Sequence, residues 1–278
     1  KYQKLVTYAA TNGTVSLDKT NVTLFRDGKW AQDGTGTLGA GQVATATANA
    51  GYIENPSGLW SPANPYEGME IAYGDNSAFI ATYVKGTFGY SVEYYFDGTI
   101  DSTKTISGSG ALDEVIAYNA PTGLTYHSKN YALDYVRGEG KKITSKPENN
   151  IVKIHYSLDM VGIDPRNPDA PDTVPDKYQK KVTYKAVNGS VNIDKTYVTL
   201  FKDNKWAVDG TGKLAATQIA TPKADTGYKA ASQLWSPKTP VADMTIEHSD
   251  NTDFIATYVV DSFAWKVEVY FDGTQDTS

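Results

Sequence analysis

The sequence predicts a mainly β protein, built as an elongated tandem array of small modules with at most one short helix each, and three observations lead to this fold class. The 278 residues include 20 tyrosines and 24 glycines but only 3 methionines, and Tyr, Val, Thr and Ile, which favour strands, dominate the apolar stretches. Asn-Gly and Asp-Gly pairs separate stretches of alternating polar and apolar residues, as they do in hairpins. The third observation is an internal repeat, which indicates several modules rather than one large domain.

The repeat is visible when the start of the chain is compared with the stretch that begins at Lys177. The first stretch reads KYQKLVTYAATNGTVSLDKTNVTLFRDGKWAQDGTGTL, and the second reads KYQKKVTYKAVNGSVNIDKTYVTLFKDNKWAVDGTGKL. After Tyr52 and Tyr228 the second copy lacks one residue, and the match resumes at LWSP, FIATYV and FDGT. We therefore expect an excised segment of a longer array, organised as repeat A (1–86), module B (87–161), a Pro/Asp-rich linker (162–176), repeat A′ (177–262) and the start of a truncated second B module (263–278).

Repeat A is expected to fold through tight hairpins. Asn12-Gly13 and Asp27-Gly28 each lie between alternating segments, and both central positions of such turns require positive φ. Asp203-Asn204 takes the corresponding place in A′. The stretch from Gly39 to Ala46 is expected to carry one short helix or turn, and residues 69–73 and 79–84 are expected to be the last two strands.

Module B is expected to contain a hairpin at Asp97-Gly98, a short helix over 111–116 capped by Ser109 or Gly110, and further strands. One strand is predicted in IVKIHYSL. Its alternation places Val152, Ile154 and Tyr156 on one face and Lys153, His155 and Ser157 on the other.

The linker between B and A′ carries a proline every three or four residues: Pro165, Pro168, Pro171 and Pro175. Proline at this spacing favours a semi-rigid polyproline II spacer. Its oxygen-bearing side chains, Asp164, Asn167, Asp169 and Asp172, are candidate Ca²⁺ ligands. The segment lacks the central Gly and distal Glu of an EF-hand loop, so a solvated linker without metal is the favoured interpretation.

Both kinds of module resemble known families. Repeat A is similar to the Listeria–Bacteroides repeat class, the β-grasp-like B-repeats of internalin-type surface proteins, in its VTY opening with Asn-Gly, in Gly51-Tyr52, in the Trp of LWSP and in FIATYV. Module B resembles mucin-binding-protein (MucBP-like) repeats in VEYYFDGTIDSTKTISG, NYALDYVRGEG and NNIVKIHYSLD. These resemblances imply a β-grasp-like fold for A and an extracellular, wall-attached location in a Gram-positive bacterium.

Composition argues against several functions. The net charge of -6 is unfavourable for nucleic-acid binding, no apolar stretch is long enough to span a membrane, and there is no cysteine for catalysis or metal binding. The three histidines, His127, His155 and His248, lie apart in sequence and are expected to be exposed. Aspartates in turns are explained by backbone geometry, so neither catalytic residues nor a cofactor nor a metal site is predicted.

The candidate binding residues are Trp30 and Trp206, which follow the predicted hairpin turns of A and A′. An exposed Trp at such a turn stacks readily on a sugar face, but core packing or the covering of a module junction is the stronger interpretation. Trp60 and Trp235 are expected in the cores.

Two functions remain open from the sequence. One is an adhesin segment, a stalk whose modules bind glycoprotein, mucin or cell-wall glycans weakly and gain avidity by repetition. The other is a purely structural spacer that contacts only neighbouring repeats of the chain and displays a distal domain. Neither is an enzyme.

Overall fold

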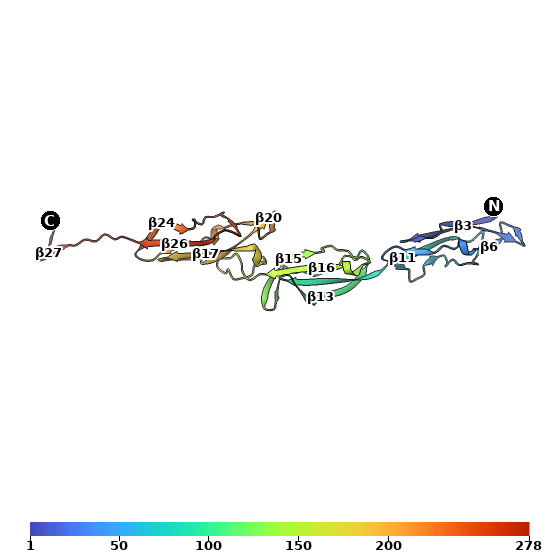
Figure 1. Cartoon of the computed structure of the whole chain (residues 1–278), viewed down its shortest axis with the longest axis horizontal. Helices are drawn as coiled ribbons and strands as arrows, with labels where there is room; N and C mark the ends of the chain where they lie inside the picture. Colours follow the sequence, from blue (N-terminus) through green and yellow to red (C-terminus); the bar gives the residue numbers. More distant parts are fainter. Residues whose placement is uncertain (278) are drawn as a thin grey trace. The chain divides into compact units, whose positions relative to one another are not determined.

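The computed structural model describes residues 1–277 and is mainly β (Figure 1). Strands hold 51% of the residues, and the helices of the described residues are single 3₁₀ turns, which confirms the prediction of a mainly β protein. These turns are η1 (Ala40–Gln42), η2 (Pro147–Asn149), η3 (Asp176–Tyr178) and η4 (Ala216–Gln218). No helix among residues 1–277 has the length and apolar character that crossing a membrane requires.

Contacts between Cα atoms divide the chain into two compact units. The first unit contains Lys1–Tyr94, Asp101–Asn119 and Val136–Lys153. The second contains Tyr95–Ile100, Ala120–Tyr135 and the described residues from Ile154 onward. Repeat A therefore lies in the first unit, and the 162–176 linker and repeat A′ lie in the second.

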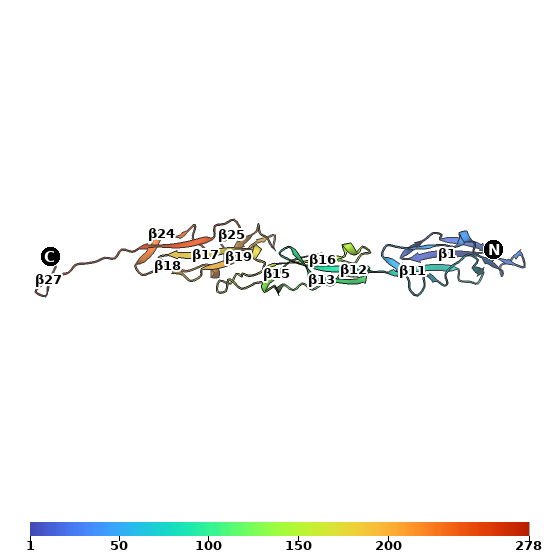
Figure 2. The same ribbon diagram turned by 60° about the horizontal axis from the view of Figure 1, so that its bottom comes forward.

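Repeat A is formed by three small sheets. Its strands are β1 (Gln3–Thr11), β2 (Gly13–Val15), β3 (Lys19–Thr23), β4 (Phe25–Arg26), β5 (Lys29–Trp30), β6 (Thr35–Thr37), β7 (Ala46–Ala48), β8 (Tyr52–Glu54), β9 (Trp60–Ser61), β10 (Glu70–Ala72) and β11 (Ala78–Lys85). The main sheet has the order β3-β1-β11-β8, with β9 also paired to β11; a second sheet has the order β10-β6-β4-β5, and β2 pairs with β7. The first and last strands, β1 and β11, are parallel neighbours (Figure 2).

Repeat A′ has the same strand order. Its strands are β17 (Gln179–Val187), β18 (Gly189–Val191), β19 (Lys195–Thr199), β20 (Phe201–Lys202), β21 (Lys205–Trp206), β22 (Thr211–Lys213), β23 (Pro222–Ala224), β24 (Tyr228–Ser236), β25 (Thr245–Glu247) and β26 (Asp253–Val260). The sheets are β19-β17-β26-β24, β21-β20-β22-β25 and β18-β23, and β17 lies parallel to β26 (Figure 1). The remaining hairpin of the chain, β27 (Val269–Phe271) with β28 (Thr274–Asp276), pairs only with itself.

The two repeats bury corresponding side chains. The core of A contains Val6, Tyr8, Val22, Leu38, Ala44, Ile71 and Phe79, and that of A′ contains Val182, Tyr184, Val198, Leu214, Ala220, Ile246 and Phe254. Trp235 is buried in its core, as predicted, and Trp60 packs against the core of A half-buried. The internal repeat of the sequence is therefore a repeat of core and topology.

Module B contributes one five-stranded sheet. Its strands are β12 (Thr87–Phe96), β13 (Thr99–Ala111), β14 (Gly123–Tyr126), β15 (Lys129–Arg137) and β16 (Ile151–Leu158), in the order β13-β12-β16-β15-β14. The predicted inward face of β16 is confirmed, because Val152, Ile154 and Tyr156 are at most 1% exposed. His155, on the other face, is not exposed as expected: its ring is stacked between those of Tyr95 and Tyr135, with centroids 4.5 and 4.3 Å away.

Most predicted hairpin turns are present. Asp27-Gly28 joins β4 to β5, and Asp203-Asn204 joins β20 to β21, with positive φ at all four residues. Asp97-Gly98 joins the neighbouring strands β12 and β13 in the same way. The short helix expected between Gly39 and Ala46 is the 3₁₀ turn η1.

The hairpin predicted at Asn12-Gly13 is wrong. Asn12 has the expected positive φ of 60°, but β1 pairs with β3 and β11, whereas β2 pairs with β7. The pair instead marks a crossing from one sheet to another: the Asn12 amide donates to the Tyr83 carbonyl at 3.0 Å. A Cβ on Gly13 would lie 2.5 Å from the Thr47 oxygen, so glycine is required here for the close approach of β7.

The short helix predicted over 111–116 is also wrong. Asp113 has a φ of +68°, which a right-handed helix does not accommodate. The Glu114 carboxylate accepts a hydrogen bond from the Ala111 N–H at 2.8 Å and closes a turn, and Val115 then forms a bridge to Lys142. Glu114 therefore stabilises a turn at the end of β13.

The passage from repeat A to module B lies within the first unit and is closed by backbone contacts. The Gly86 N–H donates to the Gly51 carbonyl at 2.8 Å, and the Leu112 N–H donates to the Gly86 carbonyl at 2.9 Å. Gly51 has a φ of +86°, and a Cβ there would lie 2.8 Å from the Leu112 side chain. Gly227, its counterpart in A′, has the same conformation with nothing within 4 Å of that position.

Candidate functional site: the joint between B, the linker and A′

The two candidate tryptophans lie in different surroundings. Trp30 is 68% exposed, and its ring stacks on that of Tyr2 with centroids 6.3 Å apart. Trp206 is half-buried, 6.0 Å from the Tyr178 ring. Trp206 lines an open hollow of about 390 Å³ together with residues of module B, Asp134 and Tyr135. Trp206 therefore lies where B meets A′, whereas Trp30 is on an open face.

The linker is not the extended polyproline II spacer that its prolines predict. The Gly162 N–H donates to the Pro168 carbonyl at 3.0 Å, and the Ala170 N–H donates to the Asn167 carbonyl at 3.2 Å. Polyproline II has no such internal hydrogen bonds. Gly162 allows the chain to close on itself, because a Cβ there would lie 2.3 Å from the Ala170 oxygen.

The candidate Ca²⁺ ligands have separate partners. Asp164 accepts from the Arg166 N–H at 2.9 Å, an Asx turn that replaces the regular polyproline geometry. Asp169 accepts two hydrogen bonds from Lys195, at 2.9 and 2.8 Å, which raise the pKa of that lysine. Asp172 accepts from the Gln179 amide at 2.8 Å. The Asn167 backbone closes the turn already described, and among residues 1–277 no cluster of three or more His, Cys, Asp or Glu could hold a metal ion.

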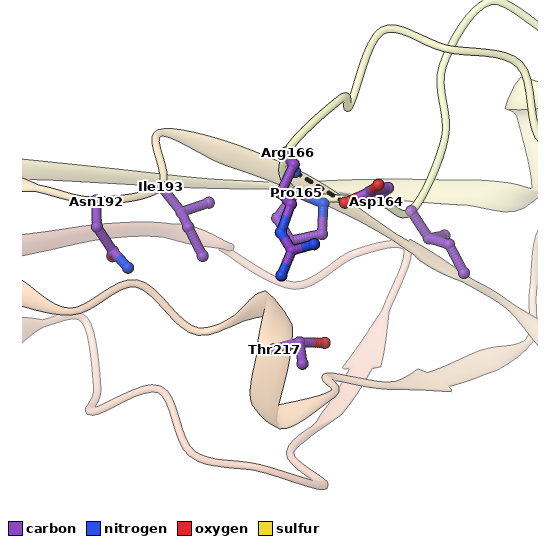
Figure 3. Close-up of a pocket in the computed structure, with 7 residues that line it drawn as sticks. Asp164, Pro165, Arg166, Asn192, Ile193 and Thr217 are labelled. Carbon is purple, nitrogen blue, oxygen red and sulfur yellow. Dashed lines mark hydrogen bonds between the residues drawn. The ribbon is translucent and has the colours of Figure 1, made fainter.

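The start of the linker lines an open groove of about 710 Å³ (Figure 3). Asp164, Pro165 and Arg166 form one side, and Asn192, Ile193 and Thr217 of repeat A′ face them. The Arg166 side chain extends from the linker toward Thr217, which lies on η4 (Figure 3). The linker thus packs along A′.

Two aspartates, the buried Asp159 and the half-buried Asp176, fasten the ends of the linker to each other. Asp159 is 2% exposed and accepts from the N–H groups of Asp172 and Thr173, at 3.0 and 2.9 Å. Asp176 accepts from the N–H groups of Met160 and Val161, at 2.9 and 3.2 Å. Each carboxylate satisfies two backbone donors of the opposite segment, so the two ends close as a reciprocal clamp.

The clamp brings negative charges together. Burial raises the pKa of both Asp159 and Asp176; the backbone hydrogen bonds act in the opposite sense, and the charge of nearby Asp172 raises both pKa values further. These groups therefore hold protons more readily in the folded chain than in an unfolded one.

Asp134 of β15 is the main contact between module B and repeat A′. Its side chain is 4% exposed, pairs with the Lys177 ammonium, and accepts from the hydroxyls of Tyr178 (2.7 Å) and Ser157 (3.1 Å). Burial acts to lower the pKa of Lys177, but its hydrogen bond and charge pairing with Asp134 outweigh this and raise it. Burial and the hydrogen bond to Asp134 raise the pKa of Tyr178.

The linker backbone is also held by A′. The Ile163 carbonyl accepts from the Thr196 hydroxyl and from the Gln218 amide, both at 3.2 Å. Thr196 is fully buried and Gln218 is 5% exposed. Gln218 also donates to the Thr196 hydroxyl and to the Tyr197 carbonyl, at 3.1 and 2.7 Å. These bonds within A′ hold the two donors, the Thr196 hydroxyl and the Gln218 amide, in place for the linker carbonyl; we call them the donor pair.

We call this set of contacts the B–A′ joint: Asp134, the stretch 159–176, and Lys177, Tyr178, Gln179, Lys195, Thr196 and Gln218. Sequence reasoning identified Trp206 as a candidate for covering a junction but missed Asp134, which sits inconspicuously in the strand ALDYV. The sequence does offer one signal for this joint, the tripeptide KYQ at the start of both repeats. Neither a turn nor a core requires these three residues there.

No protein-family model matches the chain, and no curated protein compared with it is significantly similar.

Proposed function

We propose that this chain is a spacer segment of a tandem-repeat protein on the surface of a Gram-positive bacterium. Repeats A and A′ are β-grasp-like modules, B is a MucBP-like module, and together they form an extended, non-enzymatic stalk. The observation that carries this proposal is the B–A′ joint, where the polar side chains, including the buried Asp134, are used to hold one module to the next. The parallel pairing of the first and last strands in each repeat supports the β-grasp-like assignment.

The joint matters for a spacer because a folded linker limits the orientations that neighbouring modules adopt. A flexible linker of similar length would behave as a random coil and would not transmit orientation. Here the linker is fastened to itself by Asp159 and Asp176, and to A′ by the Ile163 carbonyl.

Small-angle X-ray scattering tests the spacer. A compact protein of this length has a radius of gyration of about 19 Å, and we expect a value well above this. A second sample carrying Asp134→Ala should show a broader distribution of distances, because the joint loses its central acceptor. A radius close to the compact value in the unchanged protein would overturn the proposal.

A second function, weak multivalent binding of mucin or other glycans, is favoured by one observation. Trp30 is 68% exposed and stacked beside Tyr2, an open aromatic pair suited to a sugar face. On a glycan array, Trp30→Ala should remove the signal, whereas Trp206→Ala should retain it because Trp206 borders the joint and is half-buried there. Absence of signal from the unchanged chain would leave the spacer function alone.

A further inference from the structure

The A′ side chains that form hydrogen bonds or ion pairs with module B or the linker recur without change in repeat A. Each has an identical residue 176 positions earlier: Lys177 and Lys1, Tyr178 and Tyr2, Gln179 and Gln3, Lys195 and Lys19, Thr196 and Thr20, and Gln218 and Gln42. Trp206, which borders the joint, corresponds in the same way to Trp30. All six A′ side chains that bond across the joint are therefore present in repeat A.

These residues are more open in A than in A′. Gln3 is exposed, whereas Gln179 is 7% exposed; Thr20 is half-buried, whereas Thr196 is fully buried. Lys19 is exposed, whereas Lys195 is half-buried and bound to Asp169. Gln3 and Lys19 are exposed, and neither fold nor core requires an exposed side chain of a particular type, so their identity with Gln179 and Lys195 calls for another cause.

Other exposed positions of the two repeats do change. Leu5 becomes Lys181 and Ala9 becomes Lys185, and all four are exposed residues of the first strand of their repeat. Arg26 and Gln32 are likewise replaced, by Lys202 and Val208. At these exposed positions, which form no side-chain hydrogen bond or ion pair with module B or the linker, the residue type differs between the two repeats.

The donor pair of A is also preorganised. The Gln42 amide donates to the Thr20 hydroxyl at 3.1 Å and to the Asn21 carbonyl at 2.7 Å. These are the distances that Gln218 makes to Thr196 and to the Tyr197 carbonyl. Asn21 differs from Tyr197 in its side chain, but the contact uses the backbone carbonyl, which is unaffected by that change.

We propose that the face of A formed by Lys1, Tyr2, Gln3, Lys19, Thr20 and Gln42 is a docking face for a B module and acidic linker, joined ahead of Lys1 as residues 87–176 are joined ahead of Lys177. The inference rests on the proposed function, because it assumes a tandem array. In it, a carboxylate equivalent to Asp134 pairs with Lys1 and accepts from the Tyr2 hydroxyl. Linker carboxylates equivalent to Asp169 and Asp172 meet Lys19 and Gln3.

The remaining contact is neutral: a linker carbonyl equivalent to that of Ile163 accepts from Thr20 and Gln42. The partner is thus recognised by three carboxylates and one carbonyl at fixed positions. In this arrangement Tyr2 and Trp30 are covered by protein, as Tyr178 and Trp206 are, and are not open to a sugar.

The test is a lengthened protein in which a second copy of residues 87–176 precedes Lys1. Hydrogen exchange of the amides in β1 and β3 is measured in this protein and in the unchanged chain. We expect exchange to slow by about tenfold or more in the lengthened protein, because docking adds a cost to local opening. Asp134→Ala in the added copy should return the exchange rates toward those of the unchanged chain.

Repeat A′ provides the internal control, because β17 and β19 should keep the same protection in all three proteins. A lengthened protein in which the added linker is replaced by Gly-Ser residues should also lose the added protection in A. Equal exchange of β1 and β3 in the lengthened and unchanged proteins, with A′ intact, would overturn the docking face. Because scattering tests the spacer on the unchanged chain, failure of one proposal is distinguishable from failure of the other.

Discussion

Repeats A and A′ have the same strand order and corresponding cores, yet the same residue types lie in different environments in the two. Lys177, Tyr178 and Gln179 are held by Asp134 and the linker, whereas Lys1, Tyr2 and Gln3 are exposed. In A′ these residues are covered by module B and the linker, which lie ahead of that repeat in the chain. It teaches that burial within a tandem protein is a property of the joint as well as of the module.

The comparison is sharpest when the same substitution is made in both copies. We first expect the cores to respond equally. Phe79→Ala and Phe254→Ala remove side chains that stack at 5.6 Å on Tyr8 and Tyr184, and each should cost about 3–5 kcal/mol of unfolding free energy. Urea unfolding followed by NMR signals of the affected repeat measures this, and a difference of several kcal/mol between the copies would break the equivalence.

The next largest effect should fall on one copy only. Lys177→Ala leaves the buried Asp134 carboxylate without its cation and should cost A′ about 2 kcal/mol, the range for a lost charged hydrogen bond. Lys1→Ala removes an exposed side chain and should change the stability of A by less than about 0.5 kcal/mol. The same unfolding measurement compares them, and equal losses would mean that the joint contributes nothing to A′.

A smaller, similarly asymmetric effect is expected at the tyrosines. Tyr178→Phe deletes only the hydroxyl that donates to Asp134, so it should cost about 1 kcal/mol. Tyr2→Phe, in the same unfolding experiment, should be close to neutral. A loss of the same size at Tyr2 would show that its hydroxyl already has a structural role in A.

The smallest expected effect is a dependence on pH confined to A′ and its linker. The folded pKa of Asp159 and of Asp176 is raised above 3.8, so their protonation favours the folded state. This contribution is fully present below pH 3.8 and is lost as the pH rises through the folded pKa values. Acidification from neutral pH toward 4 should therefore stabilise A′ relative to A in thermal unfolding.

Asp159→Asn provides the control, because it should remove part of this dependence. Two other acids act in the opposite sense: Asp209 and Asp261, whose pKa values are lowered by hydrogen bonds from Lys202 and Lys229, lose their contribution to stability as the pH falls through those lowered values. The stability that Asp209 and Asp261 lose is lost below pH 3.8. It therefore does not overlap the stability that Asp159 and Asp176 gain between pH 7 and 4. A stability of A′ that falls steadily from pH 7 to 4 would contradict the prediction.

Local sequence signals predict much of this fold. Asp27-Gly28 and Asp97-Gly98 join neighbouring strands as expected, because a two-residue turn with positive φ leaves the chain few alternatives. The inward face of β16 follows from alternation alone. Asn12-Gly13 shows the limit: the same dipeptide also serves a crossing between sheets, and the dipeptide itself does not reveal that β2 pairs with the distant β7.

The joint is harder to predict because its partners are far apart in sequence. Asp134 and Lys177 are 43 residues apart, and nothing in either segment indicates the pairing. The linker fails for a different reason. Prolines favour an extended chain, but Asp159 and Asp176 offer acceptors for backbone N–H groups of the opposite end, and these bonds fold it back. Sequence spacing does not reveal which of the two effects dominates.

Gly51 has a practical consequence for anyone who shortens this protein. Because Gly51 carries no side chain, Leu112 packs against repeat A, and a version that starts at Thr87 would expose this leucine to water. A version that starts at Lys177 would instead separate the Lys177 ammonium and the Tyr178 hydroxyl from Asp134. These are polar groups that water can hydrogen-bond in place of the carboxylate. The boundary before Lys177 is therefore the better place to divide the chain for crystallisation or recombination.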